Sequence, residues 1–246
     1  MSTAWTSLTS EQQREIDALV AHYEQEKPQG LLKTFLDQIK GLLDNSHELR
    51  PCVHSTKGRL KDPEHLRHKL ARKYQDAQKK GEPFQITTDN LLQRVNDLVG
   101  VRVLHLHTRQ MVRIHPLIQD AFAEAQMPVR ESFARTWDDE SRTFFEDLGL
   151  EAQQSPNFYT SVHYVIQSNS RTLLTAEVQV RTLAEELWGE VDHAINYPER
   201  CEIATCREQI KVLARVASSC TRLVDSIFDA YDTSNSSLAG RGPTIK

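Results

Sequence analysis

The sequence predicts an α/β (α+β) protein with a mixed β-sheet flanked by helices. Two observations predict it: apolar residues recur at helical spacing near both ends of the chain, and short segments between them alternate apolar and polar residues. The 246 residues are enough for one large domain or two small ones. We divide the chain into an N-terminal helical region (1–50), a core (51–200) and a C-terminal helix with its tail (201–246).

Composition limits the class of protein. Hydrophobic residues make up 39% and charged residues 26%, which is ordinary for a globular protein, and the net charge of -4 argues against a generally basic nucleic-acid coat. No N-terminal secretion signal and no apolar run of membrane-spanning length is evident, so we expect a cytoplasmic protein with no membrane contact. No C-x-x-C pair occurs, and we expect free thiols in a reducing compartment at Cys52, Cys201, Cys206 and Cys220.

The first 46 residues predict two helices without evident chemistry. Ser10 offers an N-cap with Gln13 three residues later, which is the pattern of a capping box. The apolar period then runs to Tyr23, is expected to break at 28–30, and resumes up to residue 46. We expect both helices to pack on the sheet.

A basic segment follows. Alternation over 53–61 predicts a short strand, and Asp62 followed by Pro63 is typical of a helix start, here for a helix to about residue 78. These basic residues indicate either a solvated face or a polyphosphate site, because guanidinium groups bind phosphate through paired hydrogen bonds. The candidates are Arg59, Lys61, Lys69, Arg72 and Lys73.

The middle of the chain predicts a second polar strand. Residues 95–106 form it, with a turn at 97–100 that brings Asp97 near its start and Arg102 farther along. A helix is expected over 109–125, and residues 126–157 are expected to be an irregular, partly ordered insertion. The next strand, to residue 166, places Tyr159, Ser161 and His163 on one face.

The stretch 172–198 predicts a hairpin partner strand and then a helix. Glu177, Gln179 and Arg181 share one strand face, which indicates either an edge strand with a solvated face or a functional surface. The following helix carries apolar residues at helical spacing from Leu183 to Ile195. A long helix at 203–230 is expected to cover the sheet, with a frayed tail over 234–246.

The polar strand faces together suggest a site. Asp97 and Glu177 are carboxylates on separate strands, and cations surround them. Such a set can form structural ion pairs, or it can hold Mg²⁺, which takes one or two carboxylates and completes its shell with water and substrate phosphates. In the second case the residues are of the kind that phosphoryl or pyrophosphoryl transfer requires. The sequence contains no P-loop, no G-x-G-x-x-G and no H-E-x-x-H motif.

Several motifs in order resemble the RelA/SpoT-type (p)ppGpp synthetase domain. They are R-x-K-D-P-E at 59–64, D-L-V-G-V-R at 97–102, N-F-Y-T-S-V-H at 157–163, E-V-Q-V-R-T at 177–182 and W-x-x-x-D-H-x-x-x-Y at 188–197. The resemblance implies a nucleotidyltransferase-like fold of the small alarmone synthetase kind. It also implies a Mg²⁺-dependent pyrophosphokinase that transfers the β,γ-pyrophosphate of ATP to the ribose 3′-hydroxyl of GTP or GDP.

The same resemblance assigns roles by position. Asp97 and Glu177 would hold Mg²⁺, and Glu177 would also receive the hydroxyl proton. For ATP it implies Arg59 and Arg102 around the adenine, with Lys61, Lys69 and Arg72 at the phosphates; for the acceptor it implies Tyr159, His163 and Gln179. Without these motifs, Tyr159 would be a half-buried sheet tyrosine and His163 a hydrogen-bonded core histidine.

Departures from the family pattern leave the acceptor open. The family loop K-x-N-G-Y stands here as S-P-N-F-Y at 155–159, without its lysine and glycine, and Glu186 occupies a position where small polar residues are common. One alternative is a toxin that modifies the 3′ end of tRNA, docked by Lys73, Lys79 and Lys80 and paired with an antitoxin. Another is an inert nucleotide-binding module. A homo-oligomer is possible, and no hydrolase signature accompanies the synthetase motifs.

Overall fold

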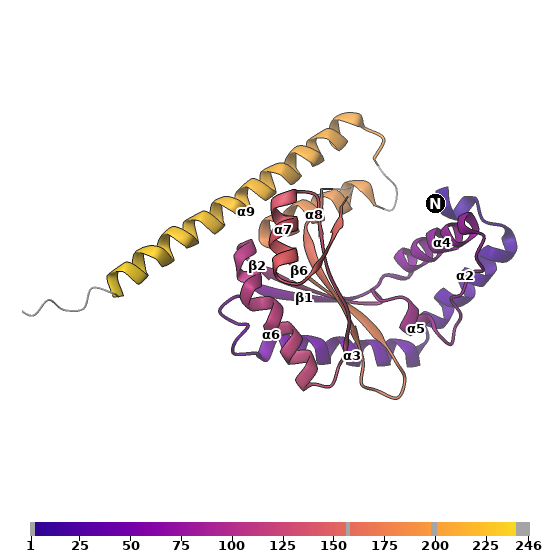
Figure 1. Ribbon diagram of the computed structural model, residues 1–246. Helices are drawn as coiled ribbons and strands as arrows, with labels where there is room; N and C mark the ends of the chain where they lie inside the picture. Colours follow the sequence, from indigo (N-terminus) through magenta and orange to yellow (C-terminus); the bar gives the residue numbers. More distant parts are fainter. Residues whose placement is uncertain (1–2, 156–157, 198–200, 240–246) are drawn as a thin grey trace, which may run out of the picture.

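The computed structural model describes residues 3–155, 158–197 and 201–239. Within these residues one sheet runs in the order β1-β2-β6-β5-β3-β4 (Figure 1). Its strands are β1 Ser55–Leu60, β2 Val99–His105, β3 Val129–Thr136, β4 Glu151–Gln154, β5 Ser161–Gln167 and β6 Thr175–Thr182. The helices are α1 Thr3–Thr6, α2 Ser10–Tyr23, α3 Glu26–Asn45, α4 Pro63–Lys80, α5 Leu91–Arg94, η1 Thr108–Gln110, α6 Met111–Glu124, α7 Asp139–Asp147, α8 Leu183–Asn196 and α9 Ala204–Ala239.

The sheet is mixed, as the sequence predicts. Strand β2 pairs antiparallel with β1 and parallel with β6, while β5 pairs antiparallel with both β6 and β3. Strand β4 adds a parallel edge next to β3. This confirms the expected mixed sheet with flanking helices.

One face of the sheet packs against the core. On this face Val178 and Val180 of β6 and Tyr164 of β5 are at most 1% exposed. Helix α3 lies against β1 and β2 on this face, and α6 packs on α3 and β3 (Figure 1). The close approach of α3 requires Gly58, since a Cβ there would lie 2.7 Å from Cδ of Lys40. The opposite face, with the alternate side chains, is left for the polar groups.

The N-terminal helices differ in detail from the prediction. The N-cap of α2 is Thr9, which forms the capping box with Gln12, so the expected box at Ser10 is displaced by one residue. Pro28 does not break α3, because the helix begins at Glu26 and the proline falls in its first turn. Backbone N–H groups in a first turn have no intrahelical acceptor, so a proline there costs no hydrogen bond.

Residues 126–155 contain two strands and a helix, which corrects the expected irregular insertion, and residues 156 and 157 lie outside the described part of the chain. Strand β3 pairs with β5 on one side and β4 on the other, and α7 packs on both β3 and β4. The helix has its own start signal, since the side chain of Asp138 accepts a hydrogen bond from the backbone of Ser141 at 2.9 Å. The many charged residues of this segment suggested an irregular insertion, but cross-strand pairing orders it.

Helices α8 and α9 also pack differently from the prediction. Helix α8 buries Glu185, Glu186 and Trp188, whereas Leu187 and Ile195 are 60% and 44% exposed. Helix α9 packs on α8 through a small apolar cluster around Trp188, instead of covering the sheet, and its far end projects from the body (Figure 1). The helix extends to residue 239, so the first part of the expected frayed tail is helical, and residues 240–246 lie outside the described residues.

Two further observations concern the cysteines and membrane-spanning helices. All four cysteines are free thiols, as predicted. Among the described residues, no helix combines the length and the apolar character needed to cross a membrane.

Candidate active site

One row of polar residues crosses the sheet. Lys57 pairs with Arg102 between β1 and β2, Arg102 with Gln179 of β6, and Gln179 with His163 of β5. Directly paired residues share a face of a sheet, so these four side chains lie on the face opposite the core. The neighbouring pair of Gly100 with Glu177 extends the polar surface by one row.

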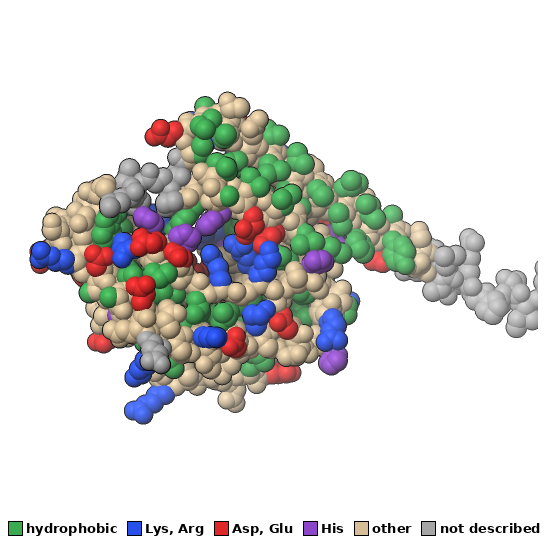
Figure 2. Space-filling view, turned by 180° about the vertical axis from the view of Figure 1, so that it is seen from behind, with side chains coloured by type: hydrophobic (Ala, Val, Ile, Leu, Met, Phe, Trp, Pro, Cys, Tyr) green, Lys and Arg blue, Asp and Glu red, His purple; other side chains and the backbone are tan. Residues whose placement is uncertain are grey.

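Two adjoining cavities lie over this face. One, of about 230 Å³, is lined by residues of β1, β2 and β6, and the other, of about 730 Å³, extends to α4, α8 and β3. Figure 2 shows Lys, Arg and His side chains gathered around a hollow on this side of the molecule. Five residues line both cavities, which makes them parts of one cleft: Arg59, Asp97, Arg102, Glu177 and Gln179.

Asp97 stands in the turn before β2 and holds two lysines. Its carboxylate lies 2.8 Å from Nζ of Lys61 and 2.7 Å from Nζ of Lys69. Burial opposes the charge of the carboxylate, but the two ammonium groups outweigh this and lower the pKa of Asp97 to about 2. Burial lowers the pKa of Lys61. Asp97 is therefore ionised at neutral pH and contacts the ammonium groups of both lysines.

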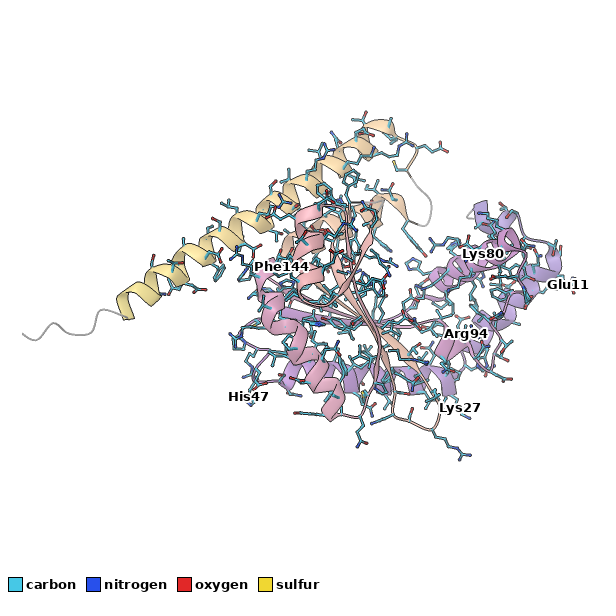
Figure 3. The ribbon with its side chains drawn as sticks, viewed as in Figure 1. Glu11, Lys27, His47, Lys80, Arg94 and Phe144 are labelled. Atoms are coloured by element: carbon cyan, nitrogen blue, oxygen red, sulfur yellow. The ribbon has the colours of Figure 1, made fainter. Side chains whose placement is uncertain are left out.

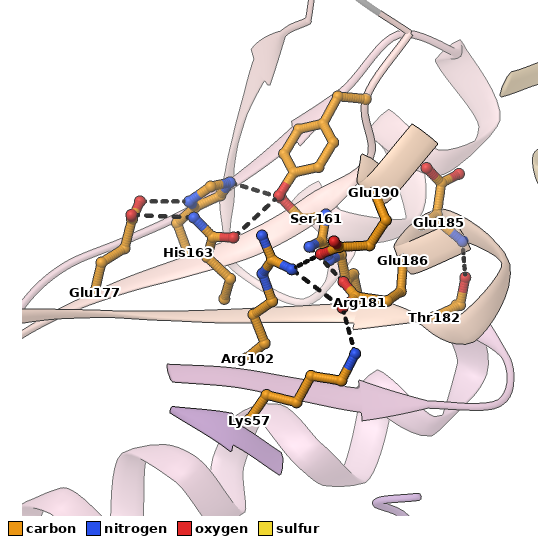
Figure 4. Close-up of polar contacts among 12 residues, drawn as sticks. Lys57, Arg102, Ser161, His163, Glu177, Arg181, Thr182, Glu185, Glu186 and Glu190 are labelled. Carbon is orange, nitrogen blue, oxygen red and sulfur yellow. Dashed lines mark hydrogen bonds and ion pairs between the residues drawn. The ribbon is translucent and has the colours of Figure 1, made fainter. Parts of the chain in front are cut away.

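Glu177 is held by β5 and by its own strand. One oxygen lies 2.8 Å from Nδ1 of His163, and the other accepts a hydrogen bond from the Gln179 amide at 3.0 Å (Figure 4). The second ring nitrogen of His163 lies 2.6 Å from the Ser161 hydroxyl. Burial works against the charged form, but the bond to His163 prevails and lowers the pKa of Glu177. The site thus presents a second ionised carboxylate in a fixed orientation.

The loop before β5 carries Tyr159. Its hydroxyl donates to the Gln179 side chain at 3.4 Å, and its ring lies near Trp188 of α8. The preceding residue, Phe158, has a φ of 58°, the left-handed conformation that favours glycine. Phe158 packs near Trp137, with the guanidinium of Arg215 5.8 Å from its ring centroid. The chain therefore keeps a left-handed turn without glycine, and anchors it by the phenyl ring.

Aromatic rings join α4 to α8 at the edge of the cleft. The ring of Tyr197 stacks on His193 at 4.7 Å and meets His65 edge-on at 4.3 Å. Burial lowers the pKa of both histidines, which favours their neutral forms. His193 and Tyr197 belong to the predicted motif at 188–197 and line the larger cavity.

Most sequence-predicted residues meet in the cleft. The larger cavity is lined by Arg59, Lys69, Asp97, Arg102, Tyr159, His163, Glu177 and Gln179. Lys61 lies behind Asp97 with a side chain 9% exposed, and Arg72 is exposed on α4 outside the cavity lining.

Sequence reasoning missed several cleft residues. Arg135 lines the larger cavity from β3, a segment that was expected to be irregular. Arg181 was recognised on the polar face of β6 but not counted as part of the site. Residues 129–136, V-R-E-S-F-A-R-T, do not alternate regularly between apolar and polar, so no local signal would have found Arg135. Trp188 also lines the larger cavity, with its ring centroid 5.9 Å from that of Tyr159; it opens the motif at 188–197 but was given no role in the site.

The site fits Mg²⁺ through its donor set. Among the described residues no group of three or more His, Cys, Asp or Glu side chains could hold a metal alone. Asp97 and Glu177 nevertheless line the same cavities, and their pKa values are lowered, so both are charged. Two ionised carboxylates suit a Mg²⁺ ion that takes its remaining ligands from water and substrate phosphates.

The fold and the cleft define a mixed α/β protein with ionised carboxylates in a cationic cleft. A protein-family model described as "region found in RelA / SpoT proteins" matches residues 58–202, which is more than half of the chain. The chain therefore belongs to the RelA/SpoT family. It is 23% identical over 177 residues to the GTP pyrophosphokinase YwaC of Bacillus subtilis (strain 168), a match that covers 70% of this chain and 71% of the relative.

Solved structures support the same fold. The small alarmone synthetase 1 from Bacillus subtilis is 17% identical and covers 88% of this chain and 97% of its own, with a TM-score of 0.57. A GTP pyrophosphokinase family protein from Streptococcus pneumoniae gives 0.56 at 17% identity, with 92% of this chain and 97% of that one covered. The synthetase 1 bound to its product pppGpp gives 0.53 at 17% identity, covering 82% and 93%.

Proposed function

We propose that this protein is a pyrophosphokinase that transfers the β,γ-pyrophosphate of ATP to the ribose 3′-hydroxyl of GTP or GDP. The observation that carries the proposal is the convergence of ionised Asp97 and Glu177 in one cleft lined by arginine and lysine. Membership of the RelA/SpoT family and distant homology to GTP pyrophosphokinases support it.

The donor side of the cleft is formed by Arg59, Arg102, Lys61, Lys69 and Asp97. Arg59 and Arg102 come from neighbouring strands and line both cavities, which suits two planar guanidinium groups that enclose an adenine. Lys69 reaches into the same cleft and would neutralise phosphate oxygens. Lys61 and Arg72, both outside the cavity lining, would act on the phosphates at longer range.

The acceptor side is formed by Tyr159, His163 and Gln179. Tyr159 would stack on the acceptor base, while His163 and Gln179 would orient the ribose. The 3′-oxygen attacks the β-phosphorus, the bond from that phosphorus to the oxygen of the α-phosphate breaks, and AMP leaves. Glu177 takes the hydroxyl proton, held in place by His163 and Gln179.

Asp97 and Glu177 are the residues that would hold Mg²⁺. The ion, when bound, would neutralise the charge on the transferred phosphates. The two lysines paired with Asp97 keep that carboxylate ionised and aimed at the cleft.

One observation favours a second acceptor, the 3′ end of tRNA. The loop before Tyr159 carries Ser155 where the family pattern has a lysine, and the nearby Arg181 is already paired with Glu186. An acceptor-side wall with few free cations suits a terminal adenosine, which has no 5′-triphosphate to neutralise. Lys73, Lys79 and Lys80 of α4 are exposed and would contact the body of a tRNA, with Lys80 at the end of the helix (Figure 3).

A labelled transfer assay tests the function. The protein with Mg²⁺ and ATP labelled in its γ-phosphate is given GTP, GDP or deacylated tRNA in parallel. We expect label on GTP or GDP and release of AMP. Label on tRNA alone would show that the acceptor is tRNA and not GTP or GDP. Label on none of the three, in a protein that still binds ATP, would show that the protein is a nucleotide-binding module without transfer activity.

A further inference from the structure

Glu186 is a buried carboxylate that contacts three cations. Its side chain is 7% exposed, and one oxygen lies 3.1 Å from Nζ of Lys57 and 3.1 Å from Nη1 of Arg102. The other oxygen pairs with the guanidinium of Arg181 (Figure 4). The three cations come from β1, β2 and β6, so a single residue of α8 joins three strands.

Two of these cations lead to opposite sides of the cleft. Arg102 lines both cavities on the donor side, opposite Arg59. Arg181 is 3% exposed and its guanidinium lies 5.7 Å from the ring centroid of Tyr159 on the acceptor side. The two oxygens of Glu186 therefore contact one arginine from each side.

The burial of this cluster makes the contacts consequential. Burial disfavours the charge of Arg102, but Glu186 and Glu190 outweigh it and raise the pKa of Arg102. When a buried ion pair loses one partner, the remaining charge is left uncompensated and its side chain must move or attract water. Arg181 has almost no access to water, so loss of Glu186 would displace it from beneath Tyr159.

We propose that Glu186 is a positioning residue that sets the adenine-side Arg102 and the acceptor-side Arg181 together, and so couples the two nucleotide subsites. This inference rests on the proposed function. Its consequence is that neutralising one carboxylate weakens donor and acceptor binding at once. Glu186 itself lines neither of the two cavities.

Helix α8 supplies matched controls for each side. Glu190 is 54% exposed and contacts Arg102 but not Arg181, so Glu190→Gln should affect the donor side only. Gly189 lies against Arg181, and a Cβ there would be 2.5 Å from Nη1, so Gly189→Ala should displace the acceptor-side guanidinium only. Alanine also favours a helix over glycine, so this variant should not lose stability through α8.

The experiment measures two affinities for each variant. Binding of a non-hydrolysable ATP analogue with Mg²⁺ is followed by calorimetry, and the KM for the acceptor identified in the labelled assay is measured separately. For Glu186→Gln we expect both to weaken by about tenfold, the size of effect for a lost buried charged contact. Glu190→Gln should weaken the donor alone by less than about threefold, because its pair is exposed.

Each outcome decides the proposal. If Glu186→Gln changes neither constant by more than about twofold, or only one of them, the coupling is wrong. If this variant does not fold, Glu186→Asp keeps the charge on a shorter side chain, and wild-type affinity for both nucleotides in it would equally overturn the coupling. A wild-type protein that binds no ATP analogue would refute the proposed function instead.

Discussion

Ion pairs hold the donor-side carboxylate Asp97, whereas ring packing and a left-handed turn hold the acceptor-side loop that carries Tyr159. On the donor side, Asp97 pairs with Lys61 and Lys69, and all three lie between β1 and β2 or on the helix that follows β1. On the acceptor side, Phe158 meets Trp137 and Arg215, which lie far from it in sequence. The difference teaches that charge fixes the position of Asp97, while tertiary packing fixes the loop of Tyr159.

Asp97→Asn should give the largest effect, and on the donor side. It removes one of the two carboxylates proposed to hold Mg²⁺ and leaves the buried Lys61 without its counter-ion. We expect kcat/KM to fall by about 10²–10³-fold, as for loss of a group that stabilises charge in the transition state. Steady-state kinetics measure this, and circular dichroism checks the fold. Activity within a few-fold of wild type would break the comparison at its donor side.

Lys69 and Arg72 sharpen the comparison within α4. Lys69 lines the cleft beside Asp97, whereas Arg72 is exposed outside the cavity lining. Lys69→Met should raise the KM for ATP by about tenfold, since a phosphate contact of this kind is charge-assisted, and Arg72→Met by less than about threefold. An equal rise of the KM for ATP in Lys69→Met and Arg72→Met would show that the ATP phosphates extend beyond the cavity.

Phe158 tests the packing of the acceptor side with a matched pair of variants. Phe158→Ala loses the ring contacts but keeps a side chain at φ 58°, while Phe158→Gly loses the same contacts and relieves the strain. We expect Phe158→Ala to raise the acceptor KM by about fivefold, and Phe158→Gly to raise it less, because the left-handed conformation costs about 1 kcal/mol in a residue with a Cβ. The KM for ATP should stay unchanged in both variants. A larger rise of the acceptor KM in Phe158→Gly than in Phe158→Ala would show that backbone strain at residue 158 does not explain the difference between the two variants.

Glu185 gives the free energy of unfolding a pH dependence between about pH 4.5 and 8. Its side chain is buried, and burial raises its pKa from 4.5 to about 8, against a hydrogen bond from the Thr160 backbone. The folded protein therefore binds this proton more tightly than the unfolded chain. The resulting stability is fully present below pH 4.5 and is lost as the pH rises through about 8.

Glu185→Gln should remove that slope. Between these two pKa values the wild-type free energy of unfolding should fall by up to about 1.4 kcal/mol per pH unit more than that of the variant. Urea denaturation at several pH values measures it, with Glu151→Gln on the exposed edge strand β4 as the control. Parallel curves for wild type and Glu185→Gln would show that this carboxyl is not held neutral.

The sequence predicted the strand residues of the cleft for a physical reason. Strand alternation in β2 and β6 placed Arg102, Glu177 and Gln179 on one face, because period-two patterning depends only on local geometry. Arg135 was missed because residues 129–136 do not alternate regularly, and the strand is defined by its pairing with β5 and β4.

Partners distant in sequence could not be predicted from local patterns. The apolar spacing in α8 suggested the wrong buried face, since Glu186 is buried through pairing with cations up to 129 positions away. The amphipathic pattern of α9 predicted a helix correctly but could not say that it packs on α8. Burial of a charge depends on its partners, and a single sequence does not show them.

The central claim is that Asp97 and Glu177 act together in one catalytic cleft, and Glu177→Gln tests it most directly. Transfer of label from γ-labelled ATP is measured for wild type and variant, with binding of the ATP analogue as the check on an intact site. The account predicts that transfer falls by at least about 100-fold while the analogue still binds. Turnover equal to wild type in Glu177→Gln would contradict it.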